Sequence, residues 1–268
     1  MLSPPTHYEI TESSLDTALR YETVIGLFAD LYRNDLDILE VGAGSAGITQ
    51  FLQHPVVGVD TAFERTSERQ TDLLTQVAGS AAELPFEDGS FDVVLSLEML
   101  EHVAPVDREA CLREMLRVLR PGGRLVLTFP ADETAAGLDR WLNDSYRRKS
   151  GHDHPWASEH LANGLPHAGD VVAQARELIG ADGHVRLLRH QSAGSFRLVH
   201  SLYTARRLSK LTRPLGLHTR PAARLLFSVC RRMHREPTYR AIVLVDRQEE
   251  NAARNSGGTI PPAASTAR

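Results

Sequence analysis

The stretch Ile38-Leu-Glu-Val-Gly-Ala-Gly-Ser-Ala-Gly47 joins a short apolar run to a glycine-rich turn. Its glycines have the spacing G-x-G-x-x-G, which lets the backbone turn tightly between a strand and a helix and approach a ligand closely. The next strand-like run ends at Asp60, 18 residues after Gly42. A carboxylate at this position can accept hydrogen bonds from both hydroxyls of a ribose. These features predict an α/β fold that binds an adenosine cofactor, although the same spacing also fits a dinucleotide.

Glu40 separates the possible cofactors, because it lies two residues before Gly42 at the carboxyl edge of the predicted strand. A carboxylate beside a pyrophosphate would repel it, whereas an ammonium or sulfonium group would be attracted. S-adenosylmethionine carries both cationic groups and no phosphate, so we favour it over NAD. A solvated charge at the strand end is the alternative for Glu40, and a dehydrogenase is the remote alternative for the protein.

Apolar runs and helical stretches alternate along the chain. The strand-like runs are 37–41, 56–60, 73–78, 91–96, 124–129, 184–190 and 239–246. The helical stretches are 13–33, 107–119, 132–149, 171–180 and two within 195–235, and Pro121-Gly122-Gly123 ends the second of them. This alternation predicts a Rossmann-like, seven-stranded, mostly parallel sheet with helices on both faces and a helical insert before the last strand.

Five segments are predicted from these boundaries. They are an N-terminal helical segment (1–36), a core (37–190) with a lid loop at 150–170, a basic helical insert (191–237), the last strand (238–247) and a disordered tail (248–268).

Composition describes an ordinary globular chain. The 268 residues are 42% hydrophobic with a formal net charge of −4, which permits one sizeable core and gives no global attraction to polyanions. Cys111 and Cys230 are far apart in helical stretches, so neither a disulfide framework nor a zinc site is expected. The first ten residues lack a basic and an apolar signal region, and no apolar run reaches membrane-spanning length. A cytoplasmic location is predicted.

Residues 38–130 resemble the core of class I S-adenosylmethionine-dependent methyltransferases, in the branch that includes small-molecule and quinone O-methyltransferases. Five motifs occur in order, at 38–47, 56–60, 79–94, 96–103 and 116–125. The resemblance implies a cofactor site that extends from the methionine half to the adenine. Its residues would be Glu40, Gly42, Ala43, Gly44 and Gly47 at the methionine half, Asp60 at the ribose, Thr61, Ser80 and Ala81 at the adenine, and Ser96 and Leu97 at the floor.

The chain departs from the family pattern at two places. Ser80 replaces a frequent Asp, which weakens the usual contact with the adenine amino group or passes it to the Ala81 amide. About a dozen residues separate the second and third strands, so the helix between them is predicted to be short or lost.

Glu98, Glu101 and His102 are spaced i, i+3 and i+4, which would place them on one face of a helix after the fourth strand. This E-x-x-E-H run resembles metal sites of some 2′-O-methylating RNA enzymes and of quinone O-methyltransferases, and it would suit Mg²⁺ or Mn²⁺. His102 is also a candidate general base. Many metal-free relatives carry a similar Glu-His pair as part of the site wall. Alternatively, His102 packs the helix and both glutamates are solvated.

The lid loop contains four histidines and Trp156 within 16 residues. Loops at the carboxyl ends of strands carry specificity in this fold, so His152, Asp153 and His154 are candidate bases, with Asp153 orienting an imidazole. The His-Pro-Trp and Gly-Leu-Pro elements resemble a loop of bacterial methyltransferases that lie among glycan and envelope biosynthetic enzymes. A surface loop pinned by Trp156 and Leu161 is the alternative.

The insert is strongly basic. The segment from Gln191 to Arg240 contains ten arginines and Lys210, opposed only by Glu236. An anionic partner would fit, such as a phosphate-bearing or lipid-linked acceptor or the inner membrane surface. Amphipathic helices that pack on the sheet or against a second subunit, in a homodimer, are the alternative. Nucleic acid is disfavoured because the segment has few aromatic residues for base stacking.

Together these patterns predict O-methylation of a small molecule or a saccharide, such as a cell-envelope or natural-product glycan. RNA or a quinone or aromatic hydroxyl is the alternative acceptor. A cofactor-binding scaffold without turnover is the alternative of a different kind.

Overall fold

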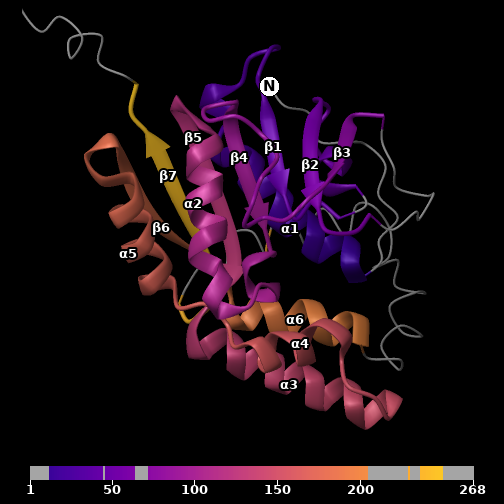
Figure 1. Cartoon of the computed structure of the whole chain (residues 1–268). Coiled ribbons are helices and arrows are strands. Elements are labelled where there is room, and N and C mark those ends of the chain that lie inside the picture. Colours follow the sequence, from indigo (N-terminus) through magenta and orange to yellow (C-terminus); the bar gives the residue numbers. More distant parts are fainter. Residues whose placement is uncertain (1–11, 45, 64–71, 205–228, 230–235, 250–268) are drawn as a thin grey trace, which may run out of the picture.

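The computed structural model describes residues 12–44, 46–63, 72–204, 229 and 236–249, and they form a seven-stranded sheet in the order β3-β2-β1-β4-β5-β7-β6 (Figure 1). The strands are β1 (Ile38–Val41), β2 (Val56–Asp60), β3 (Leu74–Ala78), β4 (Phe91–Leu97), β5 (Leu119–Pro130), β6 (Gly183–Ser192) and β7 (Thr238–Arg247). Only β7 runs antiparallel to its neighbours, β5 and β6. The predicted Rossmann-like, mostly parallel sheet is confirmed.

Helices cover both faces of the sheet. On one face, α2 (Arg108–Val118) and α5 (Ala168–Ile179) bury apolar side chains against β4, β5 and β7. On the other face, α1 (Glu12–Leu27) and the short 3-10 helix η2 (Gly47–Gln50) pack with Phe28 and Leu95 in a second cluster. The strands between them read as continuous apolar runs because both of their faces are buried, as in β4, where every residue is buried.

A third layer lies at the end of the sheet to which the parallel strands point. There α3 (Asp132–Ser150), α4 (Pro155–Asn163) and α6 (Ala193–Thr204) pack together, below the sheet in Figure 1. Phe196 and Tyr239 are fully buried between these helices and β7. Ligands bind at the carboxyl ends of the strands in such sheets. This helical layer therefore covers the side where a site is expected.

The structure corrects three local predictions. The middle of the predicted lid loop is helix α4, which has His154 as its N-cap, Pro155 in its first turn and Gly164 as its C-cap. The predicted helix through Glu98 and His102 is wrong. Glu98 has a left-handed backbone (φ 57°), and only the three-residue 3-10 helix η3 (Leu100–His102) follows it. The strand predicted at 124–129 is longer than expected, because β5 already begins at Leu119. Its pairing with β4 shifts register between Phe91 and Val93.

Four further predictions fall wholly or partly on residues outside the described ones. They are the start of the N-terminal segment before residue 12, the link between the second and third strands, the larger part of the basic insert, and the tail beyond residue 249. Within the described part of the chain, no helix is long and apolar enough to cross a membrane.

Candidate functional site

A cavity of about 380 Å³ opens beside the carboxyl ends of β1, β2 and β4. Among the predicted cofactor residues, Gly42, Asp60, Thr61, Ser80 and Ala81 line it. The described lining contains three carboxylates and no lysine or arginine. The carboxylates are Asp60, Glu98 and Asp107. Because Arg240 pairs with Glu98, the negative charge of these walls rests on Asp60 and Asp107, and it favours a cation over a pyrophosphate.

Asp60 fixes the glycine turn from the next strand. Its Oδ2 accepts a hydrogen bond from the Gly44 amide (2.9 Å), and its Oδ1 accepts one from the Ala62 amide (3.2 Å). Gly42 has φ +80°, and a Cβ there would lie 2.5 Å from Met99 Cγ. The glycine is required both by the left-handed backbone and by this close approach. The wall of the cavity at β1 is therefore bare backbone.

Glu40 holds the other end of the turn and is completely buried. Its Oε2 accepts a 2.6 Å hydrogen bond from the Ile48 amide, and its Oε1 accepts a 3.2 Å bond from the Tyr21 hydroxyl. Burial raises the pKa of Glu40 from 4.5 to about 7, opposed by these two hydrogen bonds. Glu40 does not line the cavity, and its described contacts are with the protein itself. Its proposed contact with the methionine half remains a prediction.

The other predicted cofactor residues lie in the adjacent backbone and strand. Ala43 and Gly47 are buried behind the cavity wall, and Gly44 lies in the turn. Ser96 and Leu97 are buried in β4 and do not line the cavity. The Ser96 hydroxyl has no hydrogen-bond partner among the described residues.

Glu98 faces the cavity but is already engaged by two side chains. Arg240 Nε donates to Glu98 Oε2 at 2.8 Å, and the Thr128 hydroxyl donates to Oε1 at 3.1 Å. Arg240 also donates to Gln191, which has a left-handed backbone like Glu98. Backbone strain of this kind persists where surrounding contacts determine the conformation, and it is concentrated at functional sites.

His102 lines the cavity, and it also contacts a cluster of ionisable side chains. Its Nδ1 lies 3.1 Å from Glu159 Oε1, and its Nε2 lies 3.4 Å from His160 Nε2. Glu101 is completely buried, and neither of its oxygens has a hydrogen-bond partner in the described residues. Burial and the neighbouring Glu98 raise the pKa of Glu101 well above its ordinary value.

Three residues that were not predicted as site residues complete this cluster: His160, Asp139 and Tyr239. His160 Nδ1 lies 3.0 Å from Asp139 Oδ2, and the Tyr239 hydroxyl donates to Asp139 Oδ1 at 2.7 Å. Two signals could have found them. Asp139 lies on the apolar face of α3 that also carries Ala135 and Leu142. Once 155–163 is read as a helix, His160 shares a face with Trp156 and Ala157.

The predicted bases of the lid lie elsewhere. His152 is exposed, and Asp153 pairs with Arg147 (2.6 Å) at the far end of α3. His154 is buried as the N-cap of α4, where its Nδ1 accepts from the Ala157 amide. None of the three lines the cavity, so the structure brings only His102 of the predicted catalytic residues to it.

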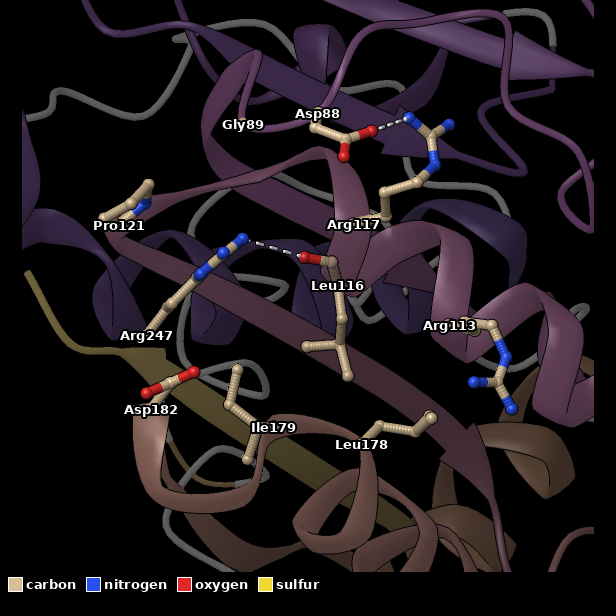
Figure 2. A pocket seen from close by; sticks show the side chains of 10 residues that line it. All are labelled: Asp88, Gly89, Arg113, Leu116, Arg117, Pro121, Leu178, Ile179, Asp182 and Arg247. Carbon is tan, nitrogen blue, oxygen red and sulfur yellow. Dashed lines mark hydrogen bonds and ion pairs between the residues drawn. The ribbon is translucent and has the colours of Figure 1, made fainter. Parts of the chain in front are cut away.

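A larger hollow of about 690 Å³ lies on the side of α2 and α5, and it contains none of the predicted site residues. Figure 2 shows Arg117 directed at Asp88 and Arg247 at the carbonyl of Leu116. The third arginine, Arg113, pairs with Glu109 on its own helix. Because its cations are engaged within the protein, we place the site in the smaller cavity.

Part of the chain matches a known family. Residues 39–127 match the methyltransferase domain family, which confirms the resemblance seen in the sequence. A sarcosine/dimethylglycine N-methyltransferase from Halorhodospira halochloris is 37% identical over 118 residues, 39% of this chain and 42% of the relative. Norajmaline N-methyltransferase from Rauvolfia serpentina is 49% identical over 126 residues, 42% of this chain and 41% of the relative. The matched segments therefore span less than half of these relatives.

Solved structures share the fold across most of the chain. A candidate sarcosine dimethylglycine methyltransferase from Galdieria sulphuraria has a TM-score of 0.54 at 17% identity and covers 89% of this chain and 88% of its own. The [4+2]-cyclase SpnF has a TM-score of 0.51 at 15% identity, with 85% and 81% covered. At these identities the likeness shows the fold alone.

Proposed function

We propose that this protein is an S-adenosylmethionine-dependent methyltransferase that methylates an oxygen of a small-molecule or saccharide acceptor. The observation that carries the proposal is the cavity at the carboxyl ends of the strands, with its carboxylates and without a lysine or arginine among its described lining residues. The methyltransferase domain match over 39–127 contains the glycine turn and Asp60, which form that cavity.

The residues present suit this cofactor. Asp60 would hold the ribose hydroxyls, the bare backbone at Gly42 would admit the methionine half, and Ser80 and Ala81 would border the adenine. When bound, S-adenosylmethionine supplies an electrophilic methyl group on a sulfonium. The protein then has to align an acceptor with that methyl group and exclude water. The helical layer reaches this region through α4, which packs against η3, the element that carries His102.

The acceptor belongs at the part of the cavity wall formed by Glu98 and His102. A hydroxyl of high pKa needs help to lose its proton, whereas an amine often does not. The cluster of Glu101, His102 and His160 behind this wall provides ionisable groups for that task. It therefore favours an oxygen acceptor over the amines named in the two N-methyltransferase relatives.

The proposal is tested with extracts incubated with the protein and S-adenosylmethionine whose methyl group is deuterated. We expect one class of metabolite to gain the labelled methyl group on oxygen, as fragmentation in the mass spectrometer would show. Extract incubated without the protein is the control. Tight cofactor binding without labelling of any metabolite would instead support a scaffold, and a label on nitrogen would contradict the oxygen acceptor.

A further inference from the structure

Two imidazoles in the cluster face each other through the same ring nitrogen. His102 Nε2 and His160 Nε2 are 3.4 Å apart, while the Nδ1 atoms lie 3.1 Å from Glu159 Oε1 and 3.0 Å from Asp139 Oδ2. A neutral imidazole has one ring proton, and a carboxylate beside Nδ1 keeps that proton there. Both Nε2 atoms then present lone pairs to each other, which is unfavourable unless a proton or a metal ion lies between them.

Glu101 directs a third donor to the same point. Its side chain is completely buried, neither oxygen has a hydrogen-bond partner among the described residues, and Oε1 is 3.9 Å from His160 Nε2. One donor atom from each of Glu101, His102 and His160 lies within 4.8 Å of the others. Buried charges in proteins are paired or coordinate metals. A buried carboxyl of this kind next to two bare imidazole nitrogens is suited to hold a cation.

We propose that Glu101, His102 and His160 bind one divalent transition-metal ion, with Zn²⁺ as the representative. Two imidazole nitrogens and one carboxylate oxygen suit Zn²⁺ and other first-row transition-metal ions, whereas Mg²⁺ prefers a set made of oxygen ligands alone. Tetrahedral zinc with bonds of about 2.1 Å separates two nitrogens by about 3.4 Å, which agrees with the distance between the two Nε2 atoms. The set differs from the one expected from the sequence, because Arg240 and Thr128 engage Glu98.

The surroundings of both histidines are those of metal ligands. A ligating histidine generally donates its other ring N–H to a carboxylate, which fixes the ring orientation. Asp139 serves His160 in this way, and its second oxygen is held by the Tyr239 hydroxyl. Glu159 serves His102. Two carboxylate–histidine pairs that converge on one point, from η3 and α4, amount to a built site.

A metal ion at this point would have a role in the proposed methyl transfer, and that role rests on the proposed function. Three protein ligands leave a fourth position, and His102 belongs both to the cluster and to the cavity wall. An acceptor hydroxyl in that position would lose its proton more readily, as water does on catalytic zinc. The inference thus specifies acceptors that offer an oxygen ligand to a metal.

The test is a calorimetric titration of the full chain with Zn²⁺, without S-adenosylmethionine or acceptor. We expect one equivalent to bind, and His160→Ala and His102→Ala each to weaken binding by more than about 100-fold, the upper end of the losses caused by outer-shell changes. Asp139→Asn should weaken it by about 10- to 100-fold. His152→Ala is the matched control, an exposed histidine outside the cluster, and it should bind as the unchanged protein does.

Co²⁺ gives an independent readout, because its visible absorption reports nitrogen and oxygen ligands. We expect a spectrum that saturates at one equivalent and is lost in His102→Ala, whose half-exposed side chain can be removed without opening the core. The proposal would be overturned if the unchanged protein failed to bind Zn²⁺ and Co²⁺, or if His102→Ala and His160→Ala left the binding unaffected. The two imidazoles would then share a proton instead of a metal ion. Since no methyl transfer is measured, this result is separate from the fate of the proposed function.

Discussion

Replacing Gly47 by alanine is expected to weaken binding of S-adenosylmethionine by at least about 100-fold. Gly47 has φ +51°, where an L-residue costs about 1–2 kcal/mol. A Cβ at this position would overlap Glu40 Oε2, which is fixed by the Ile48 amide, while Oε1 is held by the Tyr21 hydroxyl. Because that carboxylate is buried and doubly bonded, the glycine turn has to move instead, and the turn forms the cavity wall.

The measurement is a calorimetric titration of Gly47→Ala with S-adenosylmethionine and S-adenosylhomocysteine, with folding checked by circular dichroism. Gly151→Ala is the control, because Gly151 also has a left-handed backbone (φ +78°), but a Cβ there would meet nothing within 4 Å, and it caps α3 far from the turn. It should lose some stability and keep its cofactor affinity. If Gly47→Ala binds the cofactor within a few-fold of the unchanged protein, Glu40 does not shape the turn as described.

The second large effect is a loss of stability as the pH rises. The pKa of Glu40 increases from 4.5 in the unfolded chain to about 7 in the folded protein, because burial disfavours the charged form. Folding therefore favours the protonated carboxyl. Its contribution to the free energy of unfolding is fully present below pH 4.5, decreases between pH 4.5 and 7, and is lost above that range. The difference between the two pKa values corresponds to about 3 kcal/mol.

This prediction is checked by urea unfolding of the protein and of Glu40→Gln across that pH range. Glutamine keeps a carbonyl oxygen for the Ile48 amide and cannot ionise, so the variant should show a flatter pH dependence. The difference between the two proteins isolates Glu40 from Glu101, whose pKa is also raised. Parallel pH profiles for the two proteins would show that folding does not raise the pKa of Glu40.

The sequence predicted the parts of the fold that depend on local pattern. The glycine spacing before Gly47, the apolar runs and the strand that ends at Asp60 specify a Rossmann-like sheet, because chirality and burial leave few alternatives for alternating strands and helices. Five of the predicted cofactor residues line the cavity for the same reason: they lie at carboxyl ends of parallel strands, which converge at one edge of the sheet.

The catalytic end was predicted less well because it depends on contacts between distant segments. The spacing of Glu98, Glu101 and His102 fits a helix, but Glu98 adopts a left-handed backbone that Arg240, 142 residues away, helps to hold. His160 meets His102 across 58 residues through α4, a helix that was expected to be a loop. Composition alone could not show which of the four histidines belongs to the site. His160 is distinguished from the others by its buried partner Asp139, which only the folded structure reveals.

A calorimetric comparison of S-adenosylmethionine, S-adenosylhomocysteine and NAD tests most directly whether this cavity selects a cationic nucleoside without phosphates. The acidic lining around Asp60 predicts that the first two bind and that NAD gives no measurable heat of binding at the same concentrations. Binding of NAD by a protein that ignores both sulfur nucleosides would contradict the electrostatic account and the function inferred from it.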